Sequence, residues 1–455
     1  MKTAKLTAVF MLAASLMLGC SAQAQSTEEN VPAGNTETPV SEVTAEAEEK
    51  KTITITQETS EEDVSEYFTD RDMAQTADLS GAVYYTVKDG EDISITEEGV
   101  YVLSGTAEDV TVRVETDDSA KVQLVIDELN VTNTDAPVIY VVSADKVFVT
   151  TADGTSELSV TGTFADDGSV STDAVIFSKD DLVLNGTGTL VIDSSDNGIT
   201  SKDDLKITGG TYVINSSADA IEANDSIRIA DGNFTIKTSK DGLHAENDED
   251  DTQGWIYIGG GTFKIEAGSD GIQGTPMVQI DGGTFDISAE EAVEGTYVLI
   301  NGGDLTIYAT DDGINASAKS SAYTPKIEIN GGTLDITMAA GDTDALDSNG
   351  SIVINGGTVN ISAQFAFDFD SGAELNGGTV TVNGTQVTTI TESMMGGGMM
   401  GGPGNFGGQG GMPEGFGNPG QMPGSDTMTG STPDPSGQNG QMPNFGGMPG
   451  DPGRH

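Results

Sequence analysis

Six acidic residues recur at matching positions in the second half of the chain, each followed by a small residue and then an apolar one. They are Asp219, Asp241, Asp270, Glu291, Asp312 and Asp344. Further acids follow on the same side, at Glu222, Glu294, Asp347 and Asp368. If the repeats stack, neighbouring charges about 5 Å apart repel by about 1 kcal/mol in water, and by more at a partly dry surface. Carboxylate oxygens are the ligands that Ca²⁺ prefers, so this pattern predicts calcium binding.

Two interpretations of the individual acids remain open. Each Asp could accept backbone N–H bonds at its own corner, as in an Asx-turn. Alternatively, some of them form Ca²⁺ sites, and the pairs Glu290-Glu291 and Asp311-Asp312 are the best candidates because two carboxylates meet at one corner. The acidic run 248–251 is a further candidate, although charged runs in loops are usually only solvated.

Three aromatic residues could contact a sugar. Trp255 and Tyr257 alternate with the apolar Ile256 and Ile258, so we expect both rings to point outward. Tyr297 occupies the place of Trp255 two repeats later, which would set two rings about 10 Å apart on one wall. The alternative is that these rings pack against the insertion that begins at Asn247.

Catalytic residues are sparse, and we therefore predict that the protein is not an enzyme. β-Elimination from uronate chains needs a base beside a charge-neutralising cation. In the repeats Arg228 is the only arginine, and the lysines fall at unrelated positions. His244 and His455 are the only histidines, and no serine or cysteine nucleophile motif is present. Paired carboxylates, as in glycosidases, are uninformative on so acidic a chain.

A repeated strand–turn–strand unit must position these residues. Its turns are Gly209-Gly210-Thr211, Asp231-Gly232-Asn233, Gly260-Gly261-Thr262, Gly282-Gly283-Thr284, Gly302-Gly303-Asp304, Gly331-Gly332-Thr333, Gly356-Gly357-Thr358 and Gly377-Gly378-Thr379. The residues that follow each acidic position step by 22, 29, 21, 21 and 32, so the period is 21 to 22 with two insertions. Apolar residues alternate around every turn, which is typical of strands. Each repeat has an apolar stripe that it can bury only by stacking, which predicts a right-handed parallel β-helix.

The composition divides the chain into five segments. Residues 1–20 form a signal peptide, 21–75 a flexible acidic linker, and 391–455 a disordered tail rich in Gly, Pro and Met. The β-helix repeats extend over 166–390. The strand-rich but irregular region 76–165 is either the first coils or a β cap that covers the open end of the solenoid.

The signal segment contains the single cysteine of the chain. Met17-Leu18-Gly19-Cys20 resembles a bacterial lipobox, and we expect Cys20 to carry a lipid that holds the protein on the outside of the cell membrane. The alternative is an ordinary signal peptide cleaved near Ala22 or Ala24. One cysteine also excludes an internal disulfide.

The formal net charge of −54 makes nucleic acids and anionic membrane surfaces poor partners. Such a charge also destabilises a compact chain unless cations bind to it. Outside a cell, Ca²⁺ is the abundant cation that suits carboxylates. We expect a monomer.

Residues 98–106 (EGVYVLSGT), 122–130 and 136–138, together with the D-G-I and I-x-I-N-G-G-T repeats, resemble a family of bacterial cell-surface carbohydrate-binding proteins with a pectate-lyase-like right-handed β-helix. The resemblance covers about Thr76 to Gly384. It implies non-catalytic binding of plant cell-wall polysaccharide, such as cellulose or acidic pectic chains, together with Ca²⁺. A structural adhesin or coat component and a polysaccharide lyase remain as alternatives.

Overall fold

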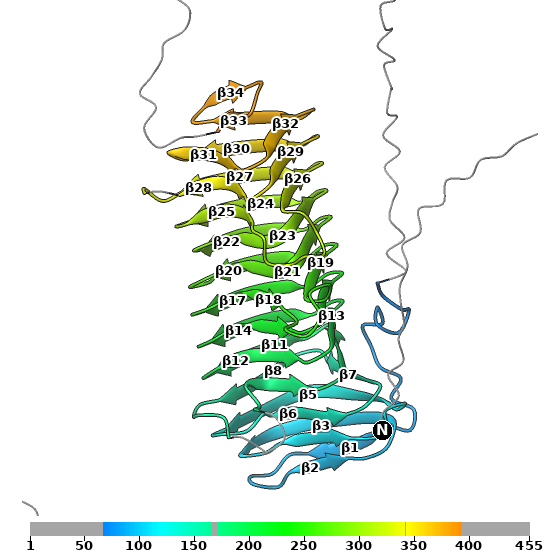
Figure 1. The fold of residues 1–455 in the computed structure, drawn as a ribbon. Coiled ribbons are helices and arrows are strands. Elements are labelled where there is room, and N and C mark those ends of the chain that lie inside the picture. The colour runs from blue at the N-terminus through cyan, green and yellow to red at the C-terminus, as the bar shows by residue number, and fades with distance from the viewer. Residues whose placement is uncertain (1–66, 166–170, 342, 393–455) are drawn as a thin grey trace, which may run out of the picture. The chain divides into compact units, whose positions relative to one another are not determined.

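The computed structural model describes residues 67–165, 171–341 and 343–392, which contain 34 strands and no helix. These residues therefore include no helix that is long and apolar enough to cross a membrane. The signal segment, Cys20, most of the acidic linker and nearly all of the tail lie outside them. The strands stack as coils of a parallel β-helix (Figure 1), as the repeat predicts.

Three parallel sheets run along the stack. Sheet 1 contains β2 (Ile93–Ile95), β4 (Val112–Glu115), β6 (Ile139–Ser143), β9 (Ala174–Ser178), β12 (Asn197–Ser201), β15 (Ile221–Ala223), β18 (Leu243–Ala245), the first parts of β21 (Ile272–Ile280) and β23 (Val293–Ile300), β25 (Asp312–Ala316), β28 (Asp344–Ser348) and β31 (Phe365–Phe369).

Sheet 2 contains β1 (Val83–Thr86), the first parts of β3 (Gly99–Glu108) and β5 (Lys121–Asn133), β7 (Lys146–Thr151), β10 (Asp181–Gly186), β13 (Asp204–Ile207), β16 (Ser226–Ile229), β19 (Trp255–Ile258), the second parts of β21 and β23, β26 (Lys326–Ile329), β29 (Ser351–Ile354) and β32 (Gly372–Leu375).

Sheet 3 contains the second parts of β3 and β5, then β8 (Thr155–Val160), β11 (Thr189–Ser194), β14 (Thr211–Ser216), β17 (Asn233–Thr238), β20 (Thr262–Glu266), β22 (Thr284–Ala289), β24 (Asp304–Ala309), β27 (Thr333–Met338), β30 (Thr358–Ser362) and β33 (Thr379–Val382). The last strand, β34 (Thr385–Val387), pairs antiparallel with β33 and covers the edge at this end.

Parallel register places like residues on like in the core. The rings of Tyr212, Phe234, Phe263 and Phe285 form a stacked column with centroids 5.2, 4.6 and 4.6 Å apart. Each ring lies against the turn that precedes it. At Gly261, for example, φ is +111°, and a Cβ would come within 3.1 Å of the Phe263 ring and 3.0 Å of the Gly232 carbonyl oxygen. The second glycine of the G-G-T turn therefore allows both the backbone conformation and the ring packing.

Residues 76–165 form coils in register with the later ones. β2 pairs β4, β4 pairs β6, and β6 pairs β9 in sheet 1, all parallel. This region therefore forms the initial coils of the β-helix, and it is not a separate β cap.

Residues 67–75, which we name the strap, lie across sheet 2 instead of forming part of a flexible linker. The Asp72 carboxylate is completely buried, 3.8 Å from Nζ of Lys146 and 3.5 Å from Nζ of Lys206. Gln75 donates to the carbonyl oxygen of Thr208 (3.0 Å) and accepts from the backbone N–H of Gly186 (2.9 Å). The linker boundary predicted at residue 75 is therefore too late, because residues 67–75 already pack against the β-helix.

The charge on Asp72 is stabilised in this position. Burial raises the pKa of the Asp72 carboxyl, but the backbone N–H of Thr69 and the ammonium groups of Lys146 and Lys206 outweigh burial and hold this pKa below its ordinary value. The Asp72 carboxylate therefore holds the strap on sheet 2 through ion pairs with Lys146 and Lys206.

Candidate functional site

The recurring acids form two adjacent columns on sheet 1, which together we name the acid wall. The corner column is Asn197, Asp219, Asp241, Asp270, Glu291, Asp312 and Asp344. The strand column is Thr200, Glu222, His244, Gln273, Glu294, Asn315, Asp347 and Asp368. The period places them in register, so one coil's acids lie about 4.8 Å from the next.

Carboxylates of the corner column bind backbone amides, but not at their own corners. Oδ1 of Asp219 accepts the N–H of Asp241 (3.0 Å), and Oδ1 of Asp241 accepts the N–H of Asp270 (2.8 Å). Asp312 accepts the N–H of Asp344 in the same way (3.1 Å). For these three aspartates the expected Asx-turn within the corner is wrong in its partner, because the accepted N–H belongs to the next coil.

Two lysines contact carboxylates of the acid wall, although neither lysine occupies a position that recurs in the repeat. Nζ of Lys202 lies 3.0 Å from Oε1 of Glu222. Lys319, from the insertion after β25, forms an ion pair with Glu294, and its Nζ faces the side-chain amide of Gln273. The description of the lysines as scattered is therefore wrong for these two, since insertions and turns bring them to the same face.

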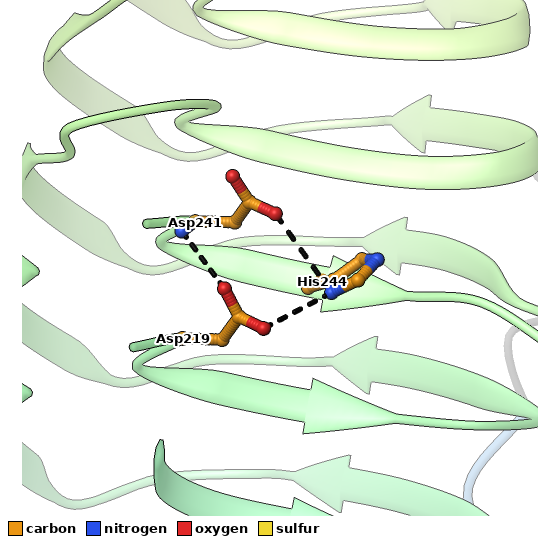
Figure 2. A group of neighbouring side chains, drawn as sticks. All are labelled: Asp219, Asp241 and His244. Atoms are coloured by element: carbon orange, nitrogen blue, oxygen red, sulfur yellow. Dashed lines mark hydrogen bonds and ion pairs between the residues drawn. The ribbon is translucent and has the colours of Figure 1, made fainter. Parts of the chain in front are cut away.

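His244 occupies one coil of the wall between two carboxylates (Figure 2). Its Nδ1 lies 3.2 Å from Oδ2 of Asp219 and 3.8 Å from Oδ2 of Asp241. Burial lowers the pKa of His244, but the hydrogen bond and charge of Asp219, with the charges of Asp241 and Glu222, outweigh burial and raise the pKa to about 9. At neutral pH the imidazole is therefore a cation within the wall.

The next coils hold three carboxylates with donor atoms within 4.8 Å of one another, those of Asp270, Glu291 and Glu294. Burial raises the pKa of Asp270 to about 8, with further contributions from neighbouring carboxylates that include Glu294. Burial and Glu294 raise the pKa of Glu291 to about 7. Nδ2 of Asn315 donates to Glu291 (3.0 Å), while its buried Oδ1 has no hydrogen-bond partner. These two coils therefore carry three carboxylates whose negative charge Lys319 neutralises only in part.

Farther along the wall, Asp312 and Asp347 form no ion pair with a basic side chain within the described residues. Burial and the charges of Asp347 and Glu291 raise the pKa of Asp312 to about 8. Burial and the charge of Asp368 raise the pKa of Asp347 to about 6. The outer members of the predicted pairs, Glu290 and Asp311, are exposed beside the corner column. Carboxylate repulsion is thus least compensated in this half of the wall.

The predicted aromatic residues lie on sheet 2. Trp255 and Tyr297 share one column, with Met277 between them, as the period predicts. Tyr257 is only 2% exposed, because the strap's Tyr67 covers it at 4.5 Å between ring centroids. The expectation that Tyr257 is available for stacking is therefore wrong, and the covering segment is the strap rather than the insertion at Asn247.

Trp255 and Tyr297 each retain an accessible aromatic neighbour. Trp255 is half-buried beside Tyr67 (5.8 Å between centroids), with the Arg228 guanidinium 4.8 Å from its ring. Tyr297 packs at 5.6 Å against Tyr323, which is 43% exposed. Tyr67 and Tyr323 carry no repeat signal, so the period could not identify them.

Two insertions meet over the edge between sheets 1 and 2. Oγ of Ser320 donates to the backbone carbonyl of Asp251 (2.6 Å), and Ser321 binds the Asp251 carboxylate through its N–H (3.1 Å). This contact fixes the second insertion, which carries Lys319 to the acid wall and Tyr323 to Tyr297. Asp251 therefore has a structural role within the run 248–251.

The fold and its surface define a parallel β-helix with an acidic wall and a neighbouring row of aromatic residues. A family model described as carbohydrate-binding domain-containing protein matches residues 89–342 and 289–388, more than half of the chain. The chain therefore belongs to this family of carbohydrate-binding domain proteins.

A relative from Acetivibrio thermocellus, also described as a carbohydrate-binding domain-containing protein, is 37% identical over 123 residues. The match covers 26% of this chain and 43% of the relative. A solved structure described as a polysaccharide lyase-like protein from C. thermocellum, in a gadolinium derivative, is 29% identical, with a TM-score of 0.43 over 49% of this chain and 92% of that chain.

Proposed function

We propose that this protein is a non-catalytic polysaccharide-binding module that holds Ca²⁺ on its acid wall and is anchored to the cell surface through a lipid on Cys20. Plant cell-wall glycans, cellulose or acidic pectic chains, are the proposed ligands. The observation that carries the proposal is the two in-register columns of carboxylates. Around Asp312 and Asp347, no basic side chain among the described residues forms an ion pair that balances their repulsion.

Calcium is proposed at two places on the wall. The first is the cluster of Asp270, Glu291 and Glu294, beside which the amide oxygen of Asn315 is a buried acceptor without a partner. The second is the coil pair with Asp312, Asp344 and Asp347. Both donor sets consist of oxygen only, which suits a hard cation that takes six to eight oxygen ligands. The coil of Asp219 and Asp241 differs because His244 lies between these residues.

A polysaccharide would meet two kinds of surface. The aromatic pairs Trp255 with Tyr67 and Tyr297 with Tyr323 lie two coils apart, about 10 Å along the helix axis, which is comparable to the spacing of alternate sugars in a chain. A uronate chain is itself an anion, so contact with a protein of net charge −54 requires cations between the two. Calcium with open coordination positions provides such a bridge.

A polysaccharide lyase is the second candidate, since Lys319 lies beside the carboxylates that could hold a cation. Its ammonium group is already paired with Glu294 and faces Gln273, so it is not a free base. Binding without cleavage is therefore the better account. Release of unsaturated products from polygalacturonate would establish the lyase instead.

The test is retention of the secreted chain on insoluble cellulose and on immobilised polygalacturonate, each with Ca²⁺ and with a chelator. The chain should include the strap, because residues 67–75 are part of the folded body. We expect calcium-dependent retention and no unsaturated product. Failure to bind either glycan would refute the carbohydrate proposal and favour a structural adhesin, which would show self-association. Replacement of Cys20 by Ser, with loss of membrane-associated protein, tests the lipid anchor.

A further inference from the structure

One coil of the acid wall carries an imidazole where its neighbours carry only oxygen donors in the same column. His244 is in register with Glu222 on one side and Gln273 on the other. Its Nδ1 and the Oδ2 atoms of Asp219 and Asp241 converge, with all three donors within 4.8 Å of one another. Figure 2 shows both carboxylates pointing toward this nitrogen from successive coils.

The two carboxylates are held in this orientation by the backbone. Oδ1 of Asp219 accepts the N–H of Asp241 (3.0 Å), and Oδ1 of Asp241 accepts the N–H of Asp270 (2.8 Å). Each carboxylate thus uses one oxygen in the ladder between coils, which fixes its other oxygen toward His244. When the side-chain amide of Gln273 is oriented with its oxygen toward Nζ of Lys319, its nitrogen donates a hydrogen bond to Oδ2 of Asp241 (3.3 Å).

The far side of the imidazole faces a carboxylate, although its Nε2 makes no hydrogen bond in this structure. Nε2 of His244 lies 3.4 Å from Oε2 of Glu246, a half-exposed residue two positions along the same chain. Histidine ligands of metal ions nearly always donate their other ring N–H to a carboxylate or carbonyl, which fixes the tautomer. A hydrogen bond from Nε2–H of His244 to Glu246 would leave the lone pair of Nδ1 directed at Asp219 and Asp241.

We propose that Asp219, Asp241 and His244 form a site for a divalent transition metal ion such as Zn²⁺, separate from the oxygen-only calcium sites. Zn–N and Zn–O bonds of about 2.0–2.1 Å in a tetrahedron place donors about 3.3 Å apart. The observed 3.2 and 3.8 Å between Nδ1 and the two carboxylate oxygens are close to this separation. Imidazole favours Zn²⁺ over Ca²⁺ and Mg²⁺, which prefer oxygen ligands.

The site is accessible to a small ion and would be incomplete without solvent or ligand. The His244 side chain is 18% exposed, so an ion can enter from the surface of sheet 1. Three protein ligands leave a position for water or for an oxygen of a bound sugar. The proposal goes beyond the proposed function, because it requires no polysaccharide.

The test uses the full chain, stripped with a chelator and kept in excess Ca²⁺ so that oxygen-only sites are occupied. Zn²⁺ binding is measured by calorimetry, and Co²⁺ binding by its visible absorption. His244→Lys keeps a cation between the two aspartates but has no lone pair for a metal. We expect this change to weaken Zn²⁺ binding by more than about 100-fold, since loss of an outer partner alone costs about 10–100-fold. Glu246→Gln removes the charge of that outer partner and should weaken Zn²⁺ binding by about 10–100-fold.

The controls are His455→Ala, which removes the second histidine of the chain, and Asp368→Asn, which removes one charge from the same column; both should retain the wild-type Zn²⁺ affinity. Unchanged affinity in His244→Lys would overturn the proposal. If that variant does not fold, X-ray absorption of the wild-type Zn²⁺ form decides, because a spectrum without imidazole scattering would also overturn it. Glycan retention of His244→Lys in Ca²⁺ is measured in parallel, so failure of this site is distinguishable from failure of the carbohydrate function.

Discussion

Replacing Asp312 with Asn should have opposite effects on the calcium-free and calcium-bound protein. The asparagine Oδ1 can still accept the N–H of Asp344, so the bond between coils is retained. The negative charge that faces Asp347 and Glu291 is removed. Without Ca²⁺ the variant should therefore be more stable than the wild type, and with Ca²⁺ it should gain less.

The magnitude follows from the ionisation of Asp312. Burial and neighbouring carboxylates raise its pKa from 3.8 to about 8. At about 1.36 kcal/mol per pKa unit, keeping this group ionised above pH 8 would cost about 5–6 kcal/mol in full. Because the side chain is only half-buried, solvent screening reduces the cost to roughly 2 kcal/mol. A calcium ion at 100 times its Kd would stabilise the wild type by about 2.7 kcal/mol.

Hydrogen exchange of the backbone amides in β25 and β28 is the suitable assay, because coils of a solenoid open locally. Asp286→Asn removes the same charge from an exposed position on sheet 3 and is the matched control. In chelator at pH 8, Asp312→Asn should increase protection of these strands relative to wild type and to the control. Lower protection in chelator, or a calcium-induced gain equal to that of the wild type, would refute the reasoning.

Three further outcomes are expected. Phe263→Ala removes a completely enclosed ring from the aromatic column and should lower the free energy of unfolding by about 3–5 kcal/mol in denaturant titrations, whereas Phe263→Leu should cost much less. The folded-state pKa of Asp72 lies below 3.8, so its contribution is complete above pH 3.8 and is lost as the pH falls through the folded value. The strap should therefore detach in acid, and the fluorescence of Trp255, the single tryptophan, should shift to the red before the β-helix circular dichroism changes; simultaneous loss of both signals would contradict this order. Tyr323→Ala should reduce glycan retention several-fold with no loss of calcium binding, while the same change at the exposed Tyr84, near the first coil, should leave retention unaltered.

The coil architecture could be predicted because it depends on short-range repetition. Alternating apolar residues around a G-G-T turn fix which side chains point inward, and one coil then specifies the next. The same period placed Trp255 and Tyr297 in one column and aligned Asp312 with Asp344.

Contacts made by non-repeating segments could not be predicted in this way. The strap reaches sheet 2 from more than 100 residues earlier in the sequence, and no period relates Asp72 to Lys206. Lys319 and Tyr323 come from an insertion whose path depends on its contact with Asp251. Predicting these contacts requires side-chain packing between segments that share no pattern, so sequence reasoning found the acid wall but not the residues that neutralise or cover it.

The acid wall also bears on how long such a helix can become. A coil interacts mainly with the coils above and below it, so apolar stacking adds a similar gain for every coil inserted. Each new coil with a corner acid also adds negative charge, whereas Lys202, His244 and Lys319 each occupy one fixed coil. Growth by coil duplication would therefore raise the electrostatic cost faster than the chain's own cations could offset it. The divalent cation content of the surroundings would then set the greatest length at which the stack remains folded.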